Sequence, residues 1–517
     1  FYRLNKTDDR QVYADIMANI NKRIDDFSLA ANIGTSFSQV YTNNAGYQGA
    51  LGDLPNVFNY YNIDKNGRDT YPLYDNSKHR VESIFASVEL GWKSMIYLTV
   101  TGRNDWDSSL LGMPDESFFY PSVGLSGVIS EMVKLPSFIS YMKVRGSFAS
   151  VGSGLTTGLT SPYSYKWDPA TGKWTTKSYK PLDNLYPERT NSWEVGLNAK
   201  FLNNKLNFDV TWYRSDTKNQ TITVPLSASS SYTEMYAQSG NVRNWGMEFA
   251  LGFHNNWGDF GWSSNLTFSF NKNEITELLD DYVASDGTHY NIDQIKKGGI
   301  DACQYILKPG GTMGDLYVTN RLKRDQEGNV WIDPDTKNVS SETLTDPEKV
   351  GSVLPDSNLG FRNDFTWKGF NLGVMLSARF GGVVLSQTQA IMDQYGVSET
   401  SANLRGQGGV TVNNGLVDTQ KYFSVVGGSN GVLSHYVYSA TNVRLQELSL
   451  GYTFPRKWFN DKLALNLSVV GRNLWMIYCK APFDPESTAS TGTYYQGLDY
   501  FMQPSLRNIG FSVKLQF

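Results

Sequence analysis

The chain has 517 residues, its aromatic content is 14%, and its formal net charge is −4. This weakly negative balance argues against a nucleic-acid partner, because proteins that bind nucleic acids are usually basic. No run of 18 apolar residues occurs, so the sequence offers no candidate transmembrane helix.

Alternating apolar and polar residues predict β-strands along the whole chain. In 206–213, for example, Leu206, Phe208 and Val210 alternate with Asn207 and Asp209. Successive side chains of a strand point to opposite faces, so each such strand has one apolar and one polar face. Fifteen strands are expected, at residues 12–23, 27–41, 80–92, 95–106, 118–131, 139–152, 188–202, 205–220, 241–257, 260–276, 358–368, 371–383, 442–455, 462–477 and 505–517.

Strand length and connection length both favour a membrane barrel. The predicted strands have 11 to 17 residues, whereas globular strands most often have about 5–6 and a membrane-crossing strand needs about 9–11. Short turns, such as Asp25-Asp26 and Lys93-Ser94, alternate with long loops at 42–79, 107–117, 153–187, 221–240, 277–357, 384–441 and 478–504. This sorting is typical of outer-membrane barrels. The predicted fold is therefore an all-β, antiparallel transmembrane β-barrel.

In such a barrel the apolar faces contact lipid and the polar faces line the lumen. Lipid contact is expected for Phe208, Val210, Leu266, Phe268, Leu465 and Leu467, and a lumenal position for Asn207, Asp209, Asn265, Thr267, Asn466 and Ser468. Tryptophans near the short turns would form an aromatic belt at that interface; they are Trp92, Trp257, Trp262, Trp367 and Trp458.

One short pattern occurs twice, as TVTGRNDW at 99–106 and SVVGRNLW at 468–475. Both copies lie on strands that rise toward a long loop, so alternation places Arg103 and Arg472 in the lumen near the outer mouth. Trp106 and Trp475 then belong to the aromatic belt on the lipid side. Arg379, in LSARFGG, is a third inward arginine. Such arginines either pair with a neighbouring carboxylate or bind substrate, and the sequence leaves both roles open.

The parity of the strands predicts that this chain is part of a barrel. The alternating last strand ends in Phe517, which is typical of a C-terminus on the periplasmic side. Counting back fifteen strands puts residue 1 near the extracellular face. Because complete bacterial barrels have an even number of strands, we expect an odd number of strands to be missing from this chain.

Several stretches, taken in their order and spacing, carry a resemblance to a known family. They include RVESIFASVELGWKSMIYLTVTGRNDW (80–106), NLYPERTNSWEVGLNAKFLNNKLNFDVTWYRSDTKNQ (184–220) and NVRLQELSLGYTFP (442–455). The chain resembles the C-terminal barrel part of SusC/RagA-type TonB-dependent transporters of the Bacteroidetes outer membrane. The resemblance implies a 22-stranded barrel around a plug, with the plug, the TonB-binding segment and the first strands absent from this chain. Residues 1–517 would then form the C-terminal portion, with extracellular loops at 42–79, 153–187, 277–357, 384–441 and 478–504.

The resemblance also implies partners and a role. A SusD-like surface lipoprotein would close over the extracellular mouth, the TonB complex would act through the plug, and outer-membrane lipid would surround the barrel. Pairs of transporter and lid are compatible with a dimer. The expected role is import of a nutrient oligomer, an oligosaccharide first and an oligopeptide as the alternative.

Aromatic residues in the loops are the candidates for contact with substrate. One loop contains Tyr163, Tyr165, Trp167, Trp174 and Tyr179, and another contains Tyr494, Tyr495, Tyr500 and Phe501. Flat rings suit the apolar faces of sugars, although the same rings could pack the loops or the lid. The predicted substrate-binding residues are Arg103, Asp105, Trp167, Tyr179, Arg379, Arg472, Tyr494 and Tyr495.

Other functional classes find less support. A non-transport β-rich binding protein would have no reason to sort its loops by length. An enzyme would need a nucleophile with a base, and no G-x-S-x-G motif or cluster of histidines supports one. The run DQEGNVWIDPD (325–335) hints at calcium but lacks the EF-hand spacing and is interpreted as turns. No catalytic residue, metal or cofactor is expected. Whether Cys303 and Cys479 pair stays open.

Overall fold

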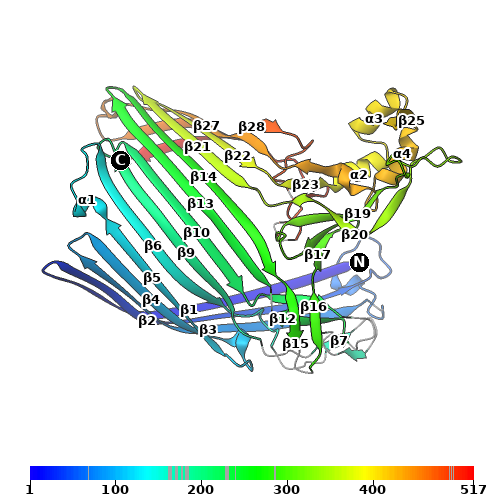
Figure 1. The fold of residues 1–517 in the computed structure, drawn as a ribbon, viewed down its shortest axis with the longest axis horizontal. Coiled ribbons are helices and arrows are strands. Elements are labelled where there is room, and N and C mark those ends of the chain that lie inside the picture. Colours follow the sequence, from blue (N-terminus) through cyan, green and yellow to red (C-terminus); the bar gives the residue numbers. More distant parts are fainter. Residues whose placement is uncertain are drawn as a thin grey trace.

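A computed structural model describes the chain except for residues 68, 161–165, 169–172, 176–178, 181–184, 227–231, 239, 284–286, 488, 491, 493 and 517; for 166–168, 173–175 and Pro225 it describes the backbone alone. Fifteen strands form one antiparallel sheet in chain order (Figure 1). They are β1 (Tyr2–Ile24), β2 (Phe27–Gly49), β3 (Tyr71–Trp92), β4 (Ile96–Asp107), β5 (Ser117–Val128), β6 (Ile139–Ser153), β9 (Glu188–Phe201), β10 (Leu206–Lys218), β13 (Asn241–Trp257), β14 (Phe260–Glu277), β21 (Ser357–Trp367), β22 (Phe370–Phe380), β27 (Asn442–Thr453), β28 (Ala464–Cys479) and β30 (Asn508–Gln516). All fifteen predicted strands are confirmed.

Some predicted boundaries were wrong. The first three strands have 23, 23 and 22 residues, so both ends of the predicted loop 42–79 are strand and the first strand begins ten residues before residue 12. Residues Ile129–Met132 form a short helix, α1, at the end of β5. Strand β22 ends at Phe380 because Gly381 and Gly382 follow with φ angles of 76° and 77°, which an extended strand cannot adopt.

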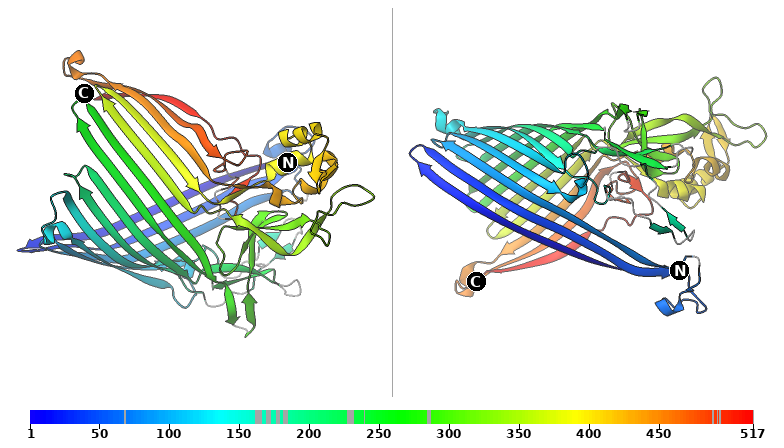
Figure 2. Two further views of the ribbon diagram at one scale, coloured as in Figure 1. Left: turned by 45° about the horizontal axis from the view of Figure 1, so that its top comes forward. Right: turned by 90° about the horizontal axis from the view of Figure 1, so that it is seen from below.

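The sheet curls into an open trough (Figure 2). In the described part of the chain, its edge strands β1 and β30 do not pair with each other. The short turns gather at one end together with α1, and the long loops gather at the other end (Figure 1). Strand β1 begins at the loop end and strand β30 ends at the turn end, as strand parity predicts. Turn residues Asp25, Lys93 and Asn203 have positive φ angles, which tight turns between twisted strands require.

The two faces of the sheet differ as alternation predicts. Phe208 lies opposite Leu251, which lies opposite Leu266, and the neighbouring row of Asn207, Gly252 and Asn265 occupies the other face. On each strand, the residues that share a face with Phe208 are called the apolar row. The residues that share a face with Asn207 are called the polar row. Leu465 and Ser468 continue these rows on β28, opposite Leu515 and Ser512.

The long loops fold into a unit with its own core, which the sequence did not predict. Helices α2 (Gln387–Gln394), α3 (Glu399–Gly406) and α4 (Thr419–Val426) lie near the sheet of β17 (Ile295–Ile300), β18 (Cys303–Leu307), β19 (Asp315–Leu322) and β20 (Ser341–Ser352). Tyr305, Leu316, Leu385 and Leu433 are buried in one hydrophobic cluster that also contains helix residues such as Phe423. These elements are too short for periodicity to reveal them, because a helix of eight residues completes only about two turns. No described helix is both long enough and apolar enough to span a membrane.

Smaller elements complete the fold. The strands are β7 (Lys166–Asp168), β8 (Lys173–Thr175), β11 (Thr221–Pro225), β12 (Glu234–Gln238), β15 (Leu279–Val283), β16 (His289–Ile292), β23 (Val383–Ser386), β24 (Val410–Val412), β25 (Gly415–Val417), β26 (Val437–Ser439) and β29 (Leu498–Asp499). Short 3-10 helices cover Tyr60–Asn62, Ser108–Leu110, Leu433–Tyr436 and Arg456–Phe459.

Candidate functional site

The polar row near the loop end carries the first group of predicted site residues. The Arg103 Nε donates to Asp105 Oδ1 at 2.6 Å, and the Tyr120 hydroxyl donates to Asp105 Oδ2 at 2.7 Å. The Arg103 Nη2 also donates to Ser83 Oγ at 2.7 Å. Asp105 is only 8% exposed. Of the two roles that the sequence left open for Arg103, the structure shows the first, which is pairing with a carboxylate.

Tyr179 joins this group through a small hydrophobic cluster. Its hydroxyl donates to the carbonyl oxygen of Leu159 at 3.1 Å, and its ring lies edge-on to Tyr236 at 5.2 Å. Tyr179 and Tyr120 both pack against the cluster around Leu159. Three of the predicted residues, Arg103, Asp105 and Tyr179, therefore lie in one connected region.

Trp167 lies opposite Trp174 in the ladder of β7 and β8, where the structure describes the backbone alone. The side chains of these two residues, and the predicted residues Tyr163 and Tyr165, lie outside the described part of the chain.

Arg472 belongs to a chain of charges across β21, β27 and β28. Its Nε donates to Glu447 Oε2 at 2.9 Å, and Arg362 Nη1 donates to Glu447 Oε1 at 3.2 Å. Arg362 also makes two hydrogen bonds to Asp364, at 2.8 and 2.9 Å. The Arg472 side chain remains 67% exposed, so a ligand in the polar trough could still reach it.

The two copies of the repeated Gly-Arg-Asn pattern share side-chain positions but differ in backbone conformation. Arg103 lies in the polar row and Trp106 in the apolar row of a regular stretch of β4, with Trp106 45% exposed. In β28 the ladder shifts beside Arg472, and Asn473 has a φ of 52°, which marks a β-bulge. Trp475 is 60% exposed and lies opposite Leu445. The shared motif therefore reflects similar side-chain requirements, and a common backbone turn is not part of it.

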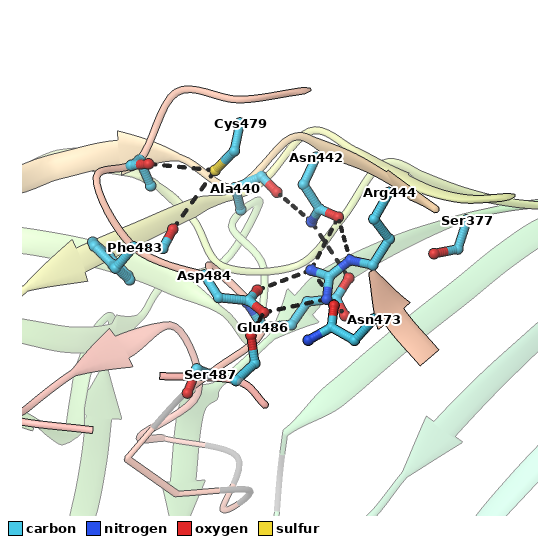
Figure 3. A network of polar contacts seen from close by, with 12 residues as sticks. Ser377, Ala440, Asn442, Arg444, Asn473, Cys479, Phe483, Asp484, Glu486 and Ser487 are labelled. Atoms are coloured by element: carbon cyan, nitrogen blue, oxygen red, sulfur yellow. Dashed lines mark hydrogen bonds and ion pairs between the residues drawn. The ribbon is translucent and has the colours of Figure 1, made fainter. Parts of the chain in front are cut away.

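A buried arginine anchors the last long loop (Figure 3). Arg444, at the start of β27, donates from Nη2 and Nη1 to the two carboxylate oxygens of Asp484 at 2.8 and 3.2 Å, and from Nε to Asn442 Oδ1 at 3.2 Å. The Arg444 and Asp484 side chains are 5% and 8% exposed. Burial alone would raise the pKa of Asp484, but the hydrogen bonds from Arg444 and Ser505 outweigh it and hold that pKa below its ordinary value.

Arg379 lies beside this network, because it pairs with Asn442 in the ladder of β22 and β27. Its Nη2 donates to the carbonyl oxygen of Val353 at 2.7 Å. Its Nε is buried and has no hydrogen-bond partner among the described residues. Arg379 is thus a loop-anchoring residue at the mouth, and no carboxylate forms an ion pair with it in the part of the chain that the structure describes.

The last loop places the remaining predicted residues at the mouth. The Tyr494 ring lies 6.2 Å from that of Tyr305 and packs against the core of the loop unit. It also lines a cavity of about 160 Å³ with Glu188 and Lys297, where burial lowers the pKa of the Lys297 ammonium. Tyr495 is 46% exposed and is the freer of the two tyrosines.

The same loop exposes further aromatic surface next to a groove. Tyr500 and Phe501 are 50% and 54% exposed, and their rings meet edge-on at 5.4 Å. Phe501 has a φ of 50°, and its N–H donates to Thr388 Oγ1 at 2.7 Å, which ties the loop to α2. The neighbouring groove has a volume of about 430 Å³, and Asp484, Asp499, Met502, Gln503 and Arg507 line it.

Sequence reasoning missed several charged residues of the polar rows. Arg145 forms a two-pronged ion pair with Asp209 at 3.0 and 3.1 Å. Arg362 and Arg444 were not singled out either. One available signal was the spacing R-x-D, seen in Arg103 with Asp105 and in Arg362 with Asp364, because residues two apart share one face of a strand. The Arg444 pair carried no such signal, since its partner is 40 residues away.

Two open questions of the sequence have structural answers. Cys303 and Cys479 are both free, and burial raises the pKa of the Cys303 thiol to about 12. In 325–335, Asp325 accepts hydrogen bonds from the N–H groups of Glu327 and Asn329, and Asp333 accepts from those of Asp335 and Thr336. The interpretation of this run as turns is confirmed.

Comparisons with known proteins match most of this chain. A family model described as TonB dependent receptor-like, beta-barrel matches residues 2–474. TonB-dependent receptor P3 of Formosa agariphila is 24% identical in an alignment 528 residues long. The alignment covers 96% of this chain and 51% of that protein. TonB-dependent receptor SusC of Bacteroides thetaiotaomicron is 25% identical over 291 residues, covering 53% of this chain and 27% of that protein.

Among solved structures, the RagAB peptide importer in the "open-open" state superposes with a TM-score of 0.79 at 18% identity, over 100% of this chain and 55% of that one. At this identity the likeness shows the fold. The chain spans about half the length of the Formosa relatives that it matches.

Proposed function

This chain belongs to the TonB-dependent receptor-like β-barrel family, and from that premise we propose that it forms the barrel wall and outer mouth of a transporter that imports a nutrient oligosaccharide. The resemblance to SusC/RagA-type proteins is confirmed by relatives that include SusC itself, and the family places the chain in the outer membrane. Energy would come from the TonB complex through a plug, and a SusD-like lipoprotein would cover the mouth.

One observation supports a carbohydrate more than any other substrate. The exposed rings of Tyr495, Tyr500 and Phe501 lie on the loop whose groove is lined by the exposed residues Gln503 and Arg507. Rings offer a flat apolar surface to the C–H face of a sugar, and amide and guanidinium groups hydrogen-bond its hydroxyl groups. The paired charges of the polar rows keep the trough hydrophilic below this mouth.

Oligopeptide import is the second candidate, and a separate observation favours it. The cavity behind Tyr494 contains the Lys297 ammonium and the Glu188 carboxylate. Within the described residues, Lys297 forms no ion pair, whereas Glu188 accepts the Thr221 N–H at 2.8 Å. A free ammonium in a small cavity could bind a peptide carboxylate.

Labelled uptake in cells that carry the full-length transporter and its lid separates these candidates. For a glycan importer, replacing both Tyr500 and Phe501 with Ala should reduce glycan uptake about thirtyfold, because each ring contributes about 1 kcal/mol. Tyr61→Ala is the matched control, since Tyr61 is 87% exposed on another loop. Peptide uptake that depends on Lys297, with no glycan uptake, would replace the first candidate by the second.

A further inference from the structure

A charged cluster lies on the wrong face of the sheet for a lumenal role. Arg214 donates from Nε to Asp216 Oδ2 at 2.9 Å, and Arg243 donates from Nε to Asp216 Oδ1 at 2.8 Å. Arg214 and Asp216 continue the row of Phe208, Val210 and Trp212 on β10. That is the apolar row, so these charges point away from the lumen.

The position of the cluster along the strands is specific. Arg214 lies opposite Trp193 on β9 and opposite Trp245 on β13, and Asp216 lies two pairs further toward the loops, opposite Arg243. Trp193 is 56% exposed and stacks obliquely on Phe148 at 4.6 Å. These rings are the loop-side aromatic belt, which sits at headgroup level in membrane barrels. With about 3.3 Å per residue, the arginines lie within roughly 10 Å of the belt on its outer side.

Positive charge dominates this region. Five basic side chains occupy the outer ends of the apolar rows of β9, β10, β13 and β14, and three carboxylates accompany them. The basic residues are Arg189, Arg214, Lys218, Arg243 and Lys272, and the acidic residues are Asp216, Glu274 and Glu277. The Lys272 ammonium also lies over the Trp245 ring, 5.9 Å from its centroid.

A groove gives the cluster space for a ligand. It has a volume of about 380 Å³, and its lining includes Phe148, Trp193, Arg214, Asp216 and Arg243. Arg214 and Arg243 share a single carboxylate, so the pair retains an excess positive charge. The two Nη groups of Arg243 have no hydrogen-bond partner among the described residues. Arginine donors with a planar fork match the oxygens of a phosphate group.

We propose that this groove binds the phosphate group of an outer-leaflet lipid. The aromatic floor would contact the upper part of the acyl chains or the sugar of the headgroup, and the two arginines would bind the phosphate above it. Asp216 positions both guanidinium groups, and its negative charge limits their affinity for the phosphate. The site is separate from the transport path, because it lies on the opposite face of the sheet from Arg103 and Arg472.

Lipid binding to the purified full-length transporter tests this proposal. Nanodiscs would contain either lipid A or the same glycolipid with its phosphates removed, and bound lipid would be counted by native mass spectrometry. Arg214→Gln with Arg243→Gln should weaken binding of the phosphorylated lipid about fivefold per arginine, and so roughly twenty-fivefold together. The control is Arg456→Gln with Lys457→Gln, which removes the same charge from the exposed 3-10 helix at the turn end and should change nothing.

Three results would overturn the proposal: unchanged affinity in the double arginine variant, equal binding of the dephosphorylated glycolipid, or displacement of the lipid by inorganic phosphate at equal concentration. Asp216→Asn provides a second variant if the arginine variant fails to insert. Removing this carboxylate should tighten binding of the phosphorylated lipid, and unchanged or weaker binding by a folded Asp216→Asn protein would also contradict the assignment.

Discussion

Replacing Arg444 with Met should release the last long loop from the barrel wall. The Arg444 and Asp484 side chains are 5% and 8% exposed, so solvent screens their attraction very little. Removing one partner of a buried ion pair leaves the other charge buried and unpaired, at a cost of about 3–5 kcal/mol. Among the described residues, Asp484 would then retain Ser505 and the N–H of Glu486 as partners. The loop and its groove should therefore open while the strands stay folded.

Hydrogen exchange measures this opening directly. Amides of 484–487 should exchange more than a hundredfold faster in Arg444→Met, since about 1.4 kcal/mol corresponds to a factor of ten. Arg472→Met is the matched control, because Arg472 pairs with Glu447 but is 67% exposed and should cost at most about 1 kcal/mol. Combining Arg444→Met with Asp484→Asn should restore part of the protection. Equal exchange in Arg444→Met and Arg472→Met would refute the reasoning that burial makes the Arg444 pair different.

Three further predictions concern the two faces of the strands, the repeated Gly-Arg-Asn pattern and the pH dependence of the last loop. Leu465→Arg should destabilise the barrel by roughly 2–4 kcal/mol and Ser468→Arg far less, as measured by urea unfolding in detergent; equal losses would contradict the assigned faces. Arg103→Ala or Arg472→Ala should reduce uptake at unchanged surface abundance, whereas Trp106→Phe and Trp475→Phe should leave it nearly intact; full uptake in the double arginine variant would leave these residues a structural role alone. The pKa of Asp484 is lower in the folded protein than its ordinary value near 3.9, so its contribution to stability is present above that value and is lost as pH falls through the lower folded pKa; the protection of the loop amides, relative to the exchange of unfolded chain at the same pH, should fall on acidification in the unmodified protein and stay flat in Asp484→Asn.

The strands could be predicted because one physical pattern governs them. A strand between lipid and a polar lumen must alternate, and segments such as 206–213 and 265–271 show that alternation. The spacing of these strands also showed the short turns, and at pairs such as Lys93-Ser94 and Asn203-Asn204 the structure has the positive φ angles of tight turns.

The loop unit and the charge partners could not be predicted in the same way. Helices α2 to α4 have eight residues each, and Tyr305 and Leu433 join one core from segments more than 100 residues apart. Arg444 could be placed on a strand by sequence, but its pairing with Asp484 depends on how the last loop folds back. Arg103 and Asp105 share one strand face, so the spacing R-x-D could have shown their pairing, and this is the general condition under which a site can be found from sequence.

The most direct test of the account is the side of the membrane on which each group of connections lies. Glu327→Cys and Asn203→Cys place thiols at two exposed positions, the first in 277–357 at the loop end and the second in a short turn. Cells that carry the unmodified protein give the background, in which Cys303 is buried. A membrane-impermeant maleimide should label Glu327→Cys in intact cells and should label Asn203→Cys only after the outer membrane is opened. Labelling of Asn203→Cys but not Glu327→Cys in intact cells would contradict the topology, and with it the outward mouth on which the proposed import depends.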